Sequence, residues 1–163
     1  MSSLKQNLDR AWAQVQAGWN NLVSKASNAL THFVHRKEDE EDAQSRALLR
    51  ASPEWALLAA EVHESGDDVT VRLEVPGMEP DDLDIEVVDR TLIVRGRKQI
   101  SRERKEGRYH ITECAYGSFE RRLPLPAEVQ ADKAEASYRK GVLTLVLPKS
   151  ERERVRRIPV KHG

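Results

Sequence analysis

The chain has 163 residues, of which 27 are Lys or Arg and 27 are Asp or Glu, so its formal net charge is zero. This balance argues against a protein that binds nucleic acid over its whole surface, and no apolar run approaches the roughly 18 residues of a membrane-spanning helix. The first residues lack the apolar stretch of a secretory signal, and the single Cys114 cannot form an internal disulfide. We therefore expect a cytoplasmic protein in a reducing compartment.

The charge is distributed unevenly along the chain. Residues 1–37 carry five bases and one acid, residues 38–42 are all acidic, and residues 149–163 carry six bases and two acids. Acidic runs of this kind are usually solvated. These shifts predict an N-terminal arm over residues 1–52 with an acidic hinge at 38–42, a central domain over 53–148 and a flexible C-terminal extension over 149–163.

Apolar residues recur every three or four positions through the arm, the spacing of one stripe on an α-helix. The stripe consists of Leu4, Leu8, Trp12, Val15, Trp19, Leu22, Ala26, Leu30 and Phe33. Such a stripe packs on the core of its own domain, or it is available to sister subunits, unfolded proteins or a membrane surface. A second, short helical pattern covers residues 43–51 and should end at Ser52-Pro53.

The centre of the chain alternates apolar and polar residues with a period of two, which predicts strands with one buried face. Strands are expected over residues 59–64, 69–75, 83–88, 91–96, 119–125, 134–138 and 142–147. The last strand is apolar on both faces except at Thr144, so it should be central or covered, whereas Pro124 favours a sheet edge. Seven or eight short strands without interleaved helices predict an all-β fold, an immunoglobulin-like antiparallel β-sandwich.

The sequence has few groups that suggest catalysis. It contains neither a glycine-rich phosphate loop nor a Gly-x-Ser-x-Gly turn, and no further ligand completes a metal site with His32 and His35. Cys114 has no activating neighbour in the sequence, which favours an ordinary thiol. The sequence does not decide whether this thiol has a redox role. The basic tail lacks the interleaved aromatic residues of a single-strand nucleic-acid binder. We therefore expect no enzyme activity, no catalytic residue, no cofactor, no metal and no nucleic-acid partner.

The C-terminal extension carries one apolar feature, Ile158-Pro159-Val160. Proline favours an extended chain, in which residues two apart point the same way. Ile158 and Val160 therefore form a two-pronged apolar plug on a polar tether, suited to docking at a sheet edge of another subunit.

Four motifs together resemble the small heat-shock proteins of the α-crystallin domain family, of bacterial type. The motifs are Val75-Pro76-Gly77 before Asp82-Leu83-Asp84-Ile85, Tyr116-Gly117-Ser118-Phe119-Glu120-Arg121 before Leu125-Pro126, Ala136-Ser137-Tyr138 before Gly141-Val142-Leu143, and Ile158-Pro159-Val160. The resemblance covers roughly residues 55–160, and the N-terminal arm is not matched. The resemblance implies an α-crystallin β-sandwich between a divergent arm and a plug-bearing tail.

The resemblance also implies roles for particular residues. The family's terminal motif docks in a groove between two strand edges, which correspond here to Leu83, Ile85, Val87, Ala136 and Tyr138. Bacterial and plant-like members form dimers by exchanging a strand carried on a long loop, which corresponds here to Arg108, Tyr109, His110, Ile111 and Thr112. Arg121 matches an arginine of an ion-pair network at the dimer interface.

These expectations combine into an ATP-independent holdase chaperone. Dimers assemble into larger homo-oligomers, the arm binds unfolding client proteins under stress and prevents their aggregation, and ATP-dependent chaperones release the clients. The client-binding residues are expected to be Leu4, Leu8, Trp12, Val15, Trp19, Leu22, Leu30 and Phe33. Two alternatives remain: a stress protein that associates with membrane surfaces through its cationic amphipathic arm, and a co-chaperone adaptor, against which the terminal plug argues.

Overall fold

The computed structural model describes residues 2–26, 29–101, 106–154 and 158–163. The chain divides into two units, residues 1–30 and 31–163. The first unit contains helix α1, Ser2–Ala26. The second contains all but the first residue of β1 (Leu30–His32), helix α2 (Ala43–Ala51) and two larger sheets. Residues 31–52, which we expected in the N-terminal arm, thus belong to the second unit.

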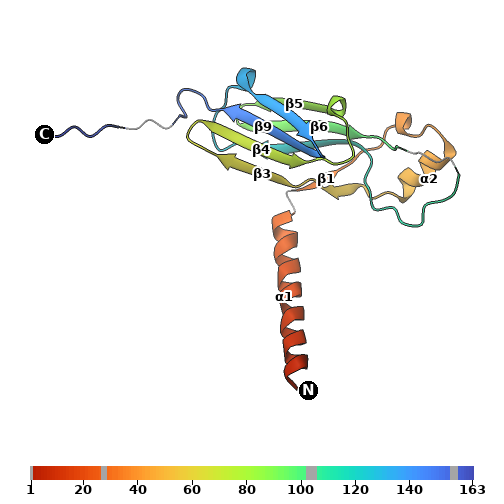
Figure 1. Cartoon of the computed structure of the whole chain (residues 1–163). Coiled ribbons are helices and arrows are strands. Elements are labelled where there is room, and N and C mark those ends of the chain that lie inside the picture. The colour runs from red at the N-terminus through yellow and green to blue at the C-terminus, as the bar shows by residue number, and fades with distance from the viewer. Residues whose placement is uncertain (1, 27–28, 102–105, 155–157) are drawn as a thin grey trace. The chain divides into compact units, whose positions relative to one another are not determined.

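Two antiparallel sheets form the central domain (Figure 1). The four-stranded sheet has the order β3 (Ala60–Glu64), β4 (Asp68–Glu74), β9 (Val142–Pro148) and β8 (Glu135–Arg139). The three-stranded sheet has the order β5 (Leu83–Val88), β6 (Thr91–Lys98) and β7 (Gly117–Pro124). This confirms the predicted mostly-β antiparallel fold, with β9 central and β7, which ends at Pro124, at an edge. The short 3-10 helices are η1 (Lys37–Asp39), η2 (Pro80–Asp82) and η3 (Ala131–Lys133).

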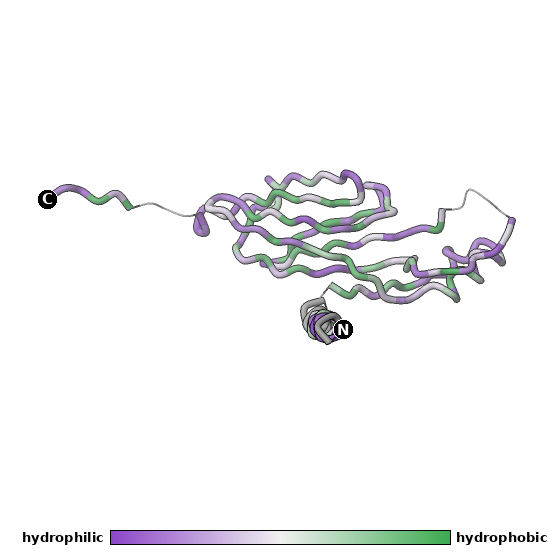
Figure 2. The backbone as a smooth tube through the Cα atoms, turned by 60° about the horizontal axis from the view of Figure 1, so that its bottom comes forward, coloured by the Kyte–Doolittle hydropathy of each residue, from purple (hydrophilic) through white to green (hydrophobic). Residues whose placement is uncertain are grey.

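The core is built from the inward residues of both sheets, as the alternation predicted. Figure 2 shows hydrophobic residues concentrated along the strands and hydrophilic residues at the turns. Burying each large aliphatic side chain contributes about 1.5 to 3 kcal/mol before the entropic cost of folding. The fully buried members are Val69, Val71, Leu73, Val75, Leu92, Val94 and Leu147.

The predicted continuation of the arm helix through residues 30–33 is wrong. Helix α1 ends at Ala26, and Leu30 begins β1, which pairs with β2 (Trp55–Leu57). Phe33 is only 2% exposed and belongs to the core, whereas Leu30 is exposed. Phe33 is therefore not available to clients, because its ring fills the sandwich.

The acidic run at 38–42 is more ordered than a solvated hinge. The side chain of Asp39 is 7% exposed and pairs with Arg97 Nη2 at 2.6 Å. Asp42 caps α2, since its carboxylate accepts a hydrogen bond from Ser45 N at 2.7 Å. Glu40 and Glu41 are exposed, as predicted. Two acids of the run therefore hold the start of the domain together.

Two of the family-like motifs contain a glycine at a position where the backbone conformation and a close neighbour require one. Gly117 has φ +111°, and a Cβ there would lie 2.4 Å from the carbonyl oxygen of Val34. The space lets Val34 and Ser118 exchange two backbone hydrogen bonds of 2.8 and 2.9 Å. Gly141 has φ +78° and lies against Pro76, so two motifs far apart in sequence are neighbours in the fold.

Candidate interaction surfaces

The predicted plug is almost completely exposed. Ile158 is 88% and Val160 is 92% exposed, and residues 158–163 form no helix or strand. Figure 2 shows this short hydrophobic stretch in an otherwise hydrophilic tail. Isolated exposed apolar residues are common on proteins. Two exposed apolar residues on either side of a proline, however, form a small apolar surface that suits contact with a partner.

The predicted groove residues lie on two edge strands. β5 is one edge of the three-stranded sheet and β8 is one edge of the four-stranded sheet. Four of the five residues are partly buried and pack against the same core: Leu83, Ile85, Val87 and Tyr138. The hydroxyl of Tyr138 donates a hydrogen bond to the carbonyl oxygen of Val75 at 2.8 Å, which fixes its ring. Ala136, the fifth, is exposed.

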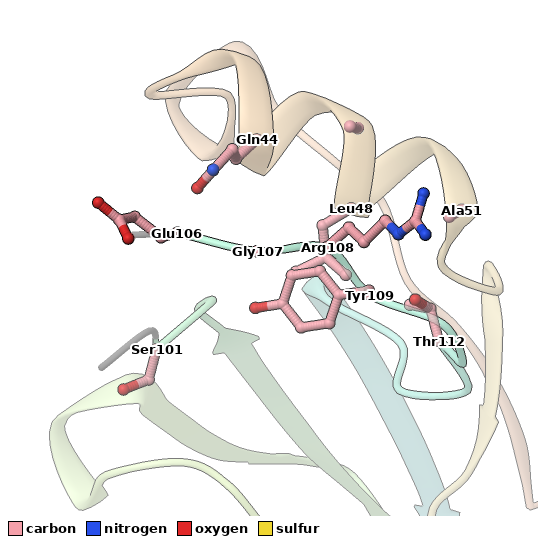
Figure 3. Close-up of a pocket in the computed structure, with 10 residues that line it drawn as sticks. Gln44, Leu48, Ala51, Ser101, Glu106, Gly107, Arg108, Tyr109 and Thr112 are labelled. Atoms are coloured by element: carbon pink, nitrogen blue, oxygen red, sulfur yellow. The ribbon is translucent and has the colours of Figure 1, made fainter. Parts of the chain in front are cut away.

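The predicted exchange segment, residues 108–112, is not part of a strand in this chain. Tyr109 and Ile111 are both exposed. A cavity of about 590 Å³ separates the segment from α2. Figure 3 shows Gln44 and Ala51 on α2 above the cavity, with Tyr109 and Thr112 of the segment below them. The segment therefore has backbone groups without sheet partners beside a partly apolar cavity.

Arg121 lies partly buried on β7. Its contacts are long hydrogen bonds of 3.4 Å from Nε to the carbonyl oxygen of Leu58 and from Nη1 to that of Arg122. Burial lowers the pKa of Arg121 from its usual range, although the guanidinium stays charged at neutral pH. No carboxylate among the described residues forms an ion pair with it.

The outer face of the three-stranded sheet carries a charge ladder. Arg95 pairs with Glu86 at 2.7 Å and with Glu120 at 2.9 Å, and Glu120 pairs with Arg122 at 2.6 Å. The hydrogen bonds from Arg122 and Arg95 hold the pKa of Glu120 below its usual range. The ladder could not be predicted from the sequence, because it depends on the strand register that sets Arg95 opposite Glu120.

A small apolar face is exposed around β1 and β2, and the sequence did not predict it. Trp55, Leu57 and Val34 are exposed, and the Trp55 ring stacks on His32 with centroids 4.8 Å apart. The opposite face of this segment, with Phe33 and Leu58, packs on the core. The alternation between the two faces was hidden in the sequence, because Leu30 and Phe33 also fit helical spacing.

Helix α1 confirms the helical part of the arm. Leu8, Trp12 and Val15 are exposed along it. The side chains of Leu4, Trp19 and Leu22 lie outside the described part of the structure. No described helix is long and apolar enough to cross a membrane.

The ionisable groups of the described residues do not assemble into a metal site, since no cluster of three His, Cys, Asp or Glu side chains occurs among them. Cys114 is exposed. Burial raises the pKa of the Tyr116 hydroxyl, and the nearby Cys114 thiol raises it further.

The strand order, the glycine-dependent motifs and the exposed terminal plug agree with one family, and the family profile described as "Hsp20/alpha crystallin family" matches residues 61–161. The chain belongs to this family. It is 34% identical over 101 residues to small heat shock protein C2 of Rickettsia felis, a match that covers 62% of this chain and 66% of that one. It is 30% identical over 100 residues to small heat shock protein C4 of the same organism, covering 61% of each. The matched region thus spans less than two thirds of these curated relatives.

Solved structures of family members have the same fold. Heat shock protein 16.0 from Schizosaccharomyces pombe matches with a TM-score of 0.54 and 34% identity, over 64% of this chain and 97% of that one. A small heat-shock protein from Xylella fastidiosa matches with a TM-score of 0.51 and 27% identity, over 66% of this chain and 98% of that one. Both matches support the small heat-shock protein fold for the sandwich.

Proposed function

We propose that this chain is an ATP-independent holdase chaperone of the cytoplasm, built from dimers that assemble into larger oligomers. The observation that carries the proposal is the nearly complete exposure of Ile158 and Val160 on a polar tail. The sandwich of this family member also has edge strands with partly apolar faces. Exposed apolar plugs and open sheet edges are costly in an isolated monomer and favour self-association.

The plug docks on the edges formed by β5 and β8. These strands offer partly exposed apolar side chains, chiefly Ile85, Val87 and Tyr138, and backbone groups without a strand partner on one side. An extended Ile-Pro-Val segment adds main-chain hydrogen bonds there, while its two side chains bury apolar area at about 25 cal/mol per Å². Each subunit thereby connects to a neighbour.

The dimer forms by exchange of residues 108–112. β3 is an edge strand of five residues, Ala60–Glu64, which equals the length of the exchanged segment. Pairing the segment with β3 of a second copy satisfies backbone groups on both sides. Arg121 then meets a carboxylate of the partner subunit, which compensates its desolvation.

Clients bind to apolar surface that the assembly leaves or makes accessible. The stripe of α1, with Leu8, Trp12 and Val15, is the principal candidate, and the face formed by Trp55 and Leu57 is a second. Binding an unfolding chain there limits its aggregation, and ATP-dependent chaperones release it. Phe33, which is buried, is excluded from this role.

Aggregation of a heat-denatured client tests the proposal. The purified full chain should suppress light scattering by the client without ATP, and a chain lacking residues 1–26 should suppress it much less while keeping the thermal stability of the sandwich. Failure of the full chain to keep the client soluble contradicts the holdase proposal. Equal suppression by the truncated chain rejects α1 as the principal client surface.

A membrane-surface role is the second candidate, favoured by the exposed Leu8, Trp12 and Val15 on a helix with three bases and one acid. Interfacial helices combine such an apolar stripe with positive charge. Co-sedimentation with anionic vesicles at low and at physiological salt tests it. Binding that persists at physiological salt and is lost without residues 1–26 supports this role, and no binding at low salt excludes it.

A further inference from the structure

The C-terminal extension begins with a segment that is held firmly on the sandwich. We name residues 149–154 the tail root. Its backbone continues the sheet contacts of β9: Lys149 N donates to the carbonyl oxygen of Asp67 and Ser150 N to that of Glu128, both at 2.8 Å. Gln130 Nε2 also donates to the carbonyl oxygen of Lys149 at 2.9 Å. The predicted flexible extension therefore does not begin at residue 149.

Side chains reinforce the tail root. Lys149, whose side chain is 4% exposed, forms an ion pair of 2.6 Å with Glu64 on β3. Arg152 Nη2 lies 3.2 Å from both carboxylate oxygens of Glu128, and Glu128 N donates to Glu153 Oε1 at 3.4 Å. Glu153 N closes a turn onto Ser150 O at 3.0 Å. The sandwich is thus linked to the root as far as residue 153.

This attachment limits the reach of the plug. Residues 154–157 separate Glu153, the last residue linked to the sandwich, from Ile158, so Ile158 lies at most about 18 Å from Glu153, at roughly 3.3 to 3.6 Å per residue. If the backbone after Ser150 were free, Ile158 could lie up to about 28 Å from Ser150. A short tether that leaves the sandwich at a fixed point restricts where the accepting edge of a neighbouring subunit can lie.

We propose that the tail root, and the Glu128–Arg152 pair in particular, positions the plug and so sets how uniform the oligomer is. This inference rests on the proposed assembly through Ile158 and Val160. The backbone bonds at residues 149 and 150 fix the start of the root. The Glu128–Arg152 pair and the long hydrogen bond from Glu128 N to Glu153 hold residues 151–153. They are the weak connections of the root, because exposed ion pairs contribute little. Loss of this pair lengthens the effective tether and lets one plug reach neighbours in several arrangements.

Charge reversal tests the proposal in the full chain. Glu128→Arg and Arg152→Glu each put like charges together, although they change the net charge in opposite directions, and the double variant restores an opposite pair. Glu151→Arg is the matched control for Glu128→Arg. It makes the same change in charge, but Glu151 pairs with Arg154 inside the tail and not with the sandwich.

Two measurements decide the outcome. Hydrogen exchange of residues 150–154 should be roughly three- to tenfold faster in both single variants and return to the wild-type rate in the double variant. Native mass spectrometry should show a broader distribution of oligomer sizes in the single variants and the wild-type distribution in the double variant and in Glu151→Arg. Unchanged exchange, or faster exchange with an unchanged distribution, overturns the proposal. If replacing Ile158 and Val160 by Ala leaves the wild-type assembly intact, it is the proposed plug-driven assembly that fails.

Discussion

Phe33 packs against Phe119 with ring centroids 5.2 Å apart and the two rings tilted by 42°. This contact joins a residue that precedes the matched family region to β7 of the sandwich. The backbone of Phe33 is held as well, since Phe33 N donates a hydrogen bond to the carbonyl oxygen of Glu54 at 2.7 Å. Phe33, which lies outside the matched family region, is therefore a structural part of the sandwich.

Replacing Phe33 by Ala should lower the free energy of unfolding by about 3 kcal/mol, because it removes a buried ring and leaves a cavity. Urea unfolding followed by tryptophan fluorescence measures the change. Val34→Ala is the control: its side chain is exposed, so little change is expected. Equal effects of the two substitutions would contradict the assignment of Phe33 to the core.

Gly117→Ala should also destabilise the sandwich, by about 2 kcal/mol or more, because the new Cβ meets the Val34 carbonyl at 2.4 Å in a backbone conformation with φ +111°. Gly107→Ala separates the steric clash from the backbone strain. Gly107 has φ +100° but nothing within 4 Å of its Cβ position, so it reports the backbone strain alone. Thermal unfolding of both variants should therefore show a larger loss for Gly117→Ala.

The strands and α2 could be predicted from sequence because their signals are local. Residues 69–75 alternate strictly, and α2 ends at Ala51, directly before Ser52-Pro53, as its pattern required. The segment with Leu30 and Phe33 could not be read in the same way, because its apolar spacing of three continues the helical stripe. Only tertiary contact with Phe119 shows that Thr31 and Phe33 share a buried face.

The interaction surfaces divide along similar lines. Ile158 and Val160 stand out in a polar tail, so their exposure followed from the sequence. The attachment of the tail root did not, because it depends on Glu64 and Glu128, which lie far from it in sequence and approach it only when the sheet is formed. Arg121 was placed by a motif, whereas its desolvation required the fold.

Replacing both Ile158 and Val160 by Ala should reduce the assembly toward dimers, because most of the apolar area of the plug is lost while the exchange segment is unchanged. Multi-angle light scattering across a range of protein concentrations measures the mass. Lys161→Ala, which changes the same tail without altering the plug, should keep the wild-type mass. An unchanged mass for the double variant would reject docking of the plug as the link between dimers.

Asp39 should give the fold a specific pH dependence. Burial alone would raise its pKa, but the hydrogen bonds from the Arg36 backbone and from Arg97, with the positive charge of Arg97, outweigh burial and leave the pKa of Asp39 below its usual value. A carboxyl with a lowered folded-state pKa contributes stability above its unfolded pKa, near 4, and this contribution is lost as the pH falls through the folded-state pKa. Asp39→Asn should therefore cost about 1 to 2 kcal/mol at pH 7, and the difference from the wild type should shrink below about pH 4. Urea unfolding at pH 7, 5 and 3 measures this, with the exposed Glu40→Gln as control. A difference that stays constant down to pH 3 would contradict a role for the Asp39–Arg97 pair.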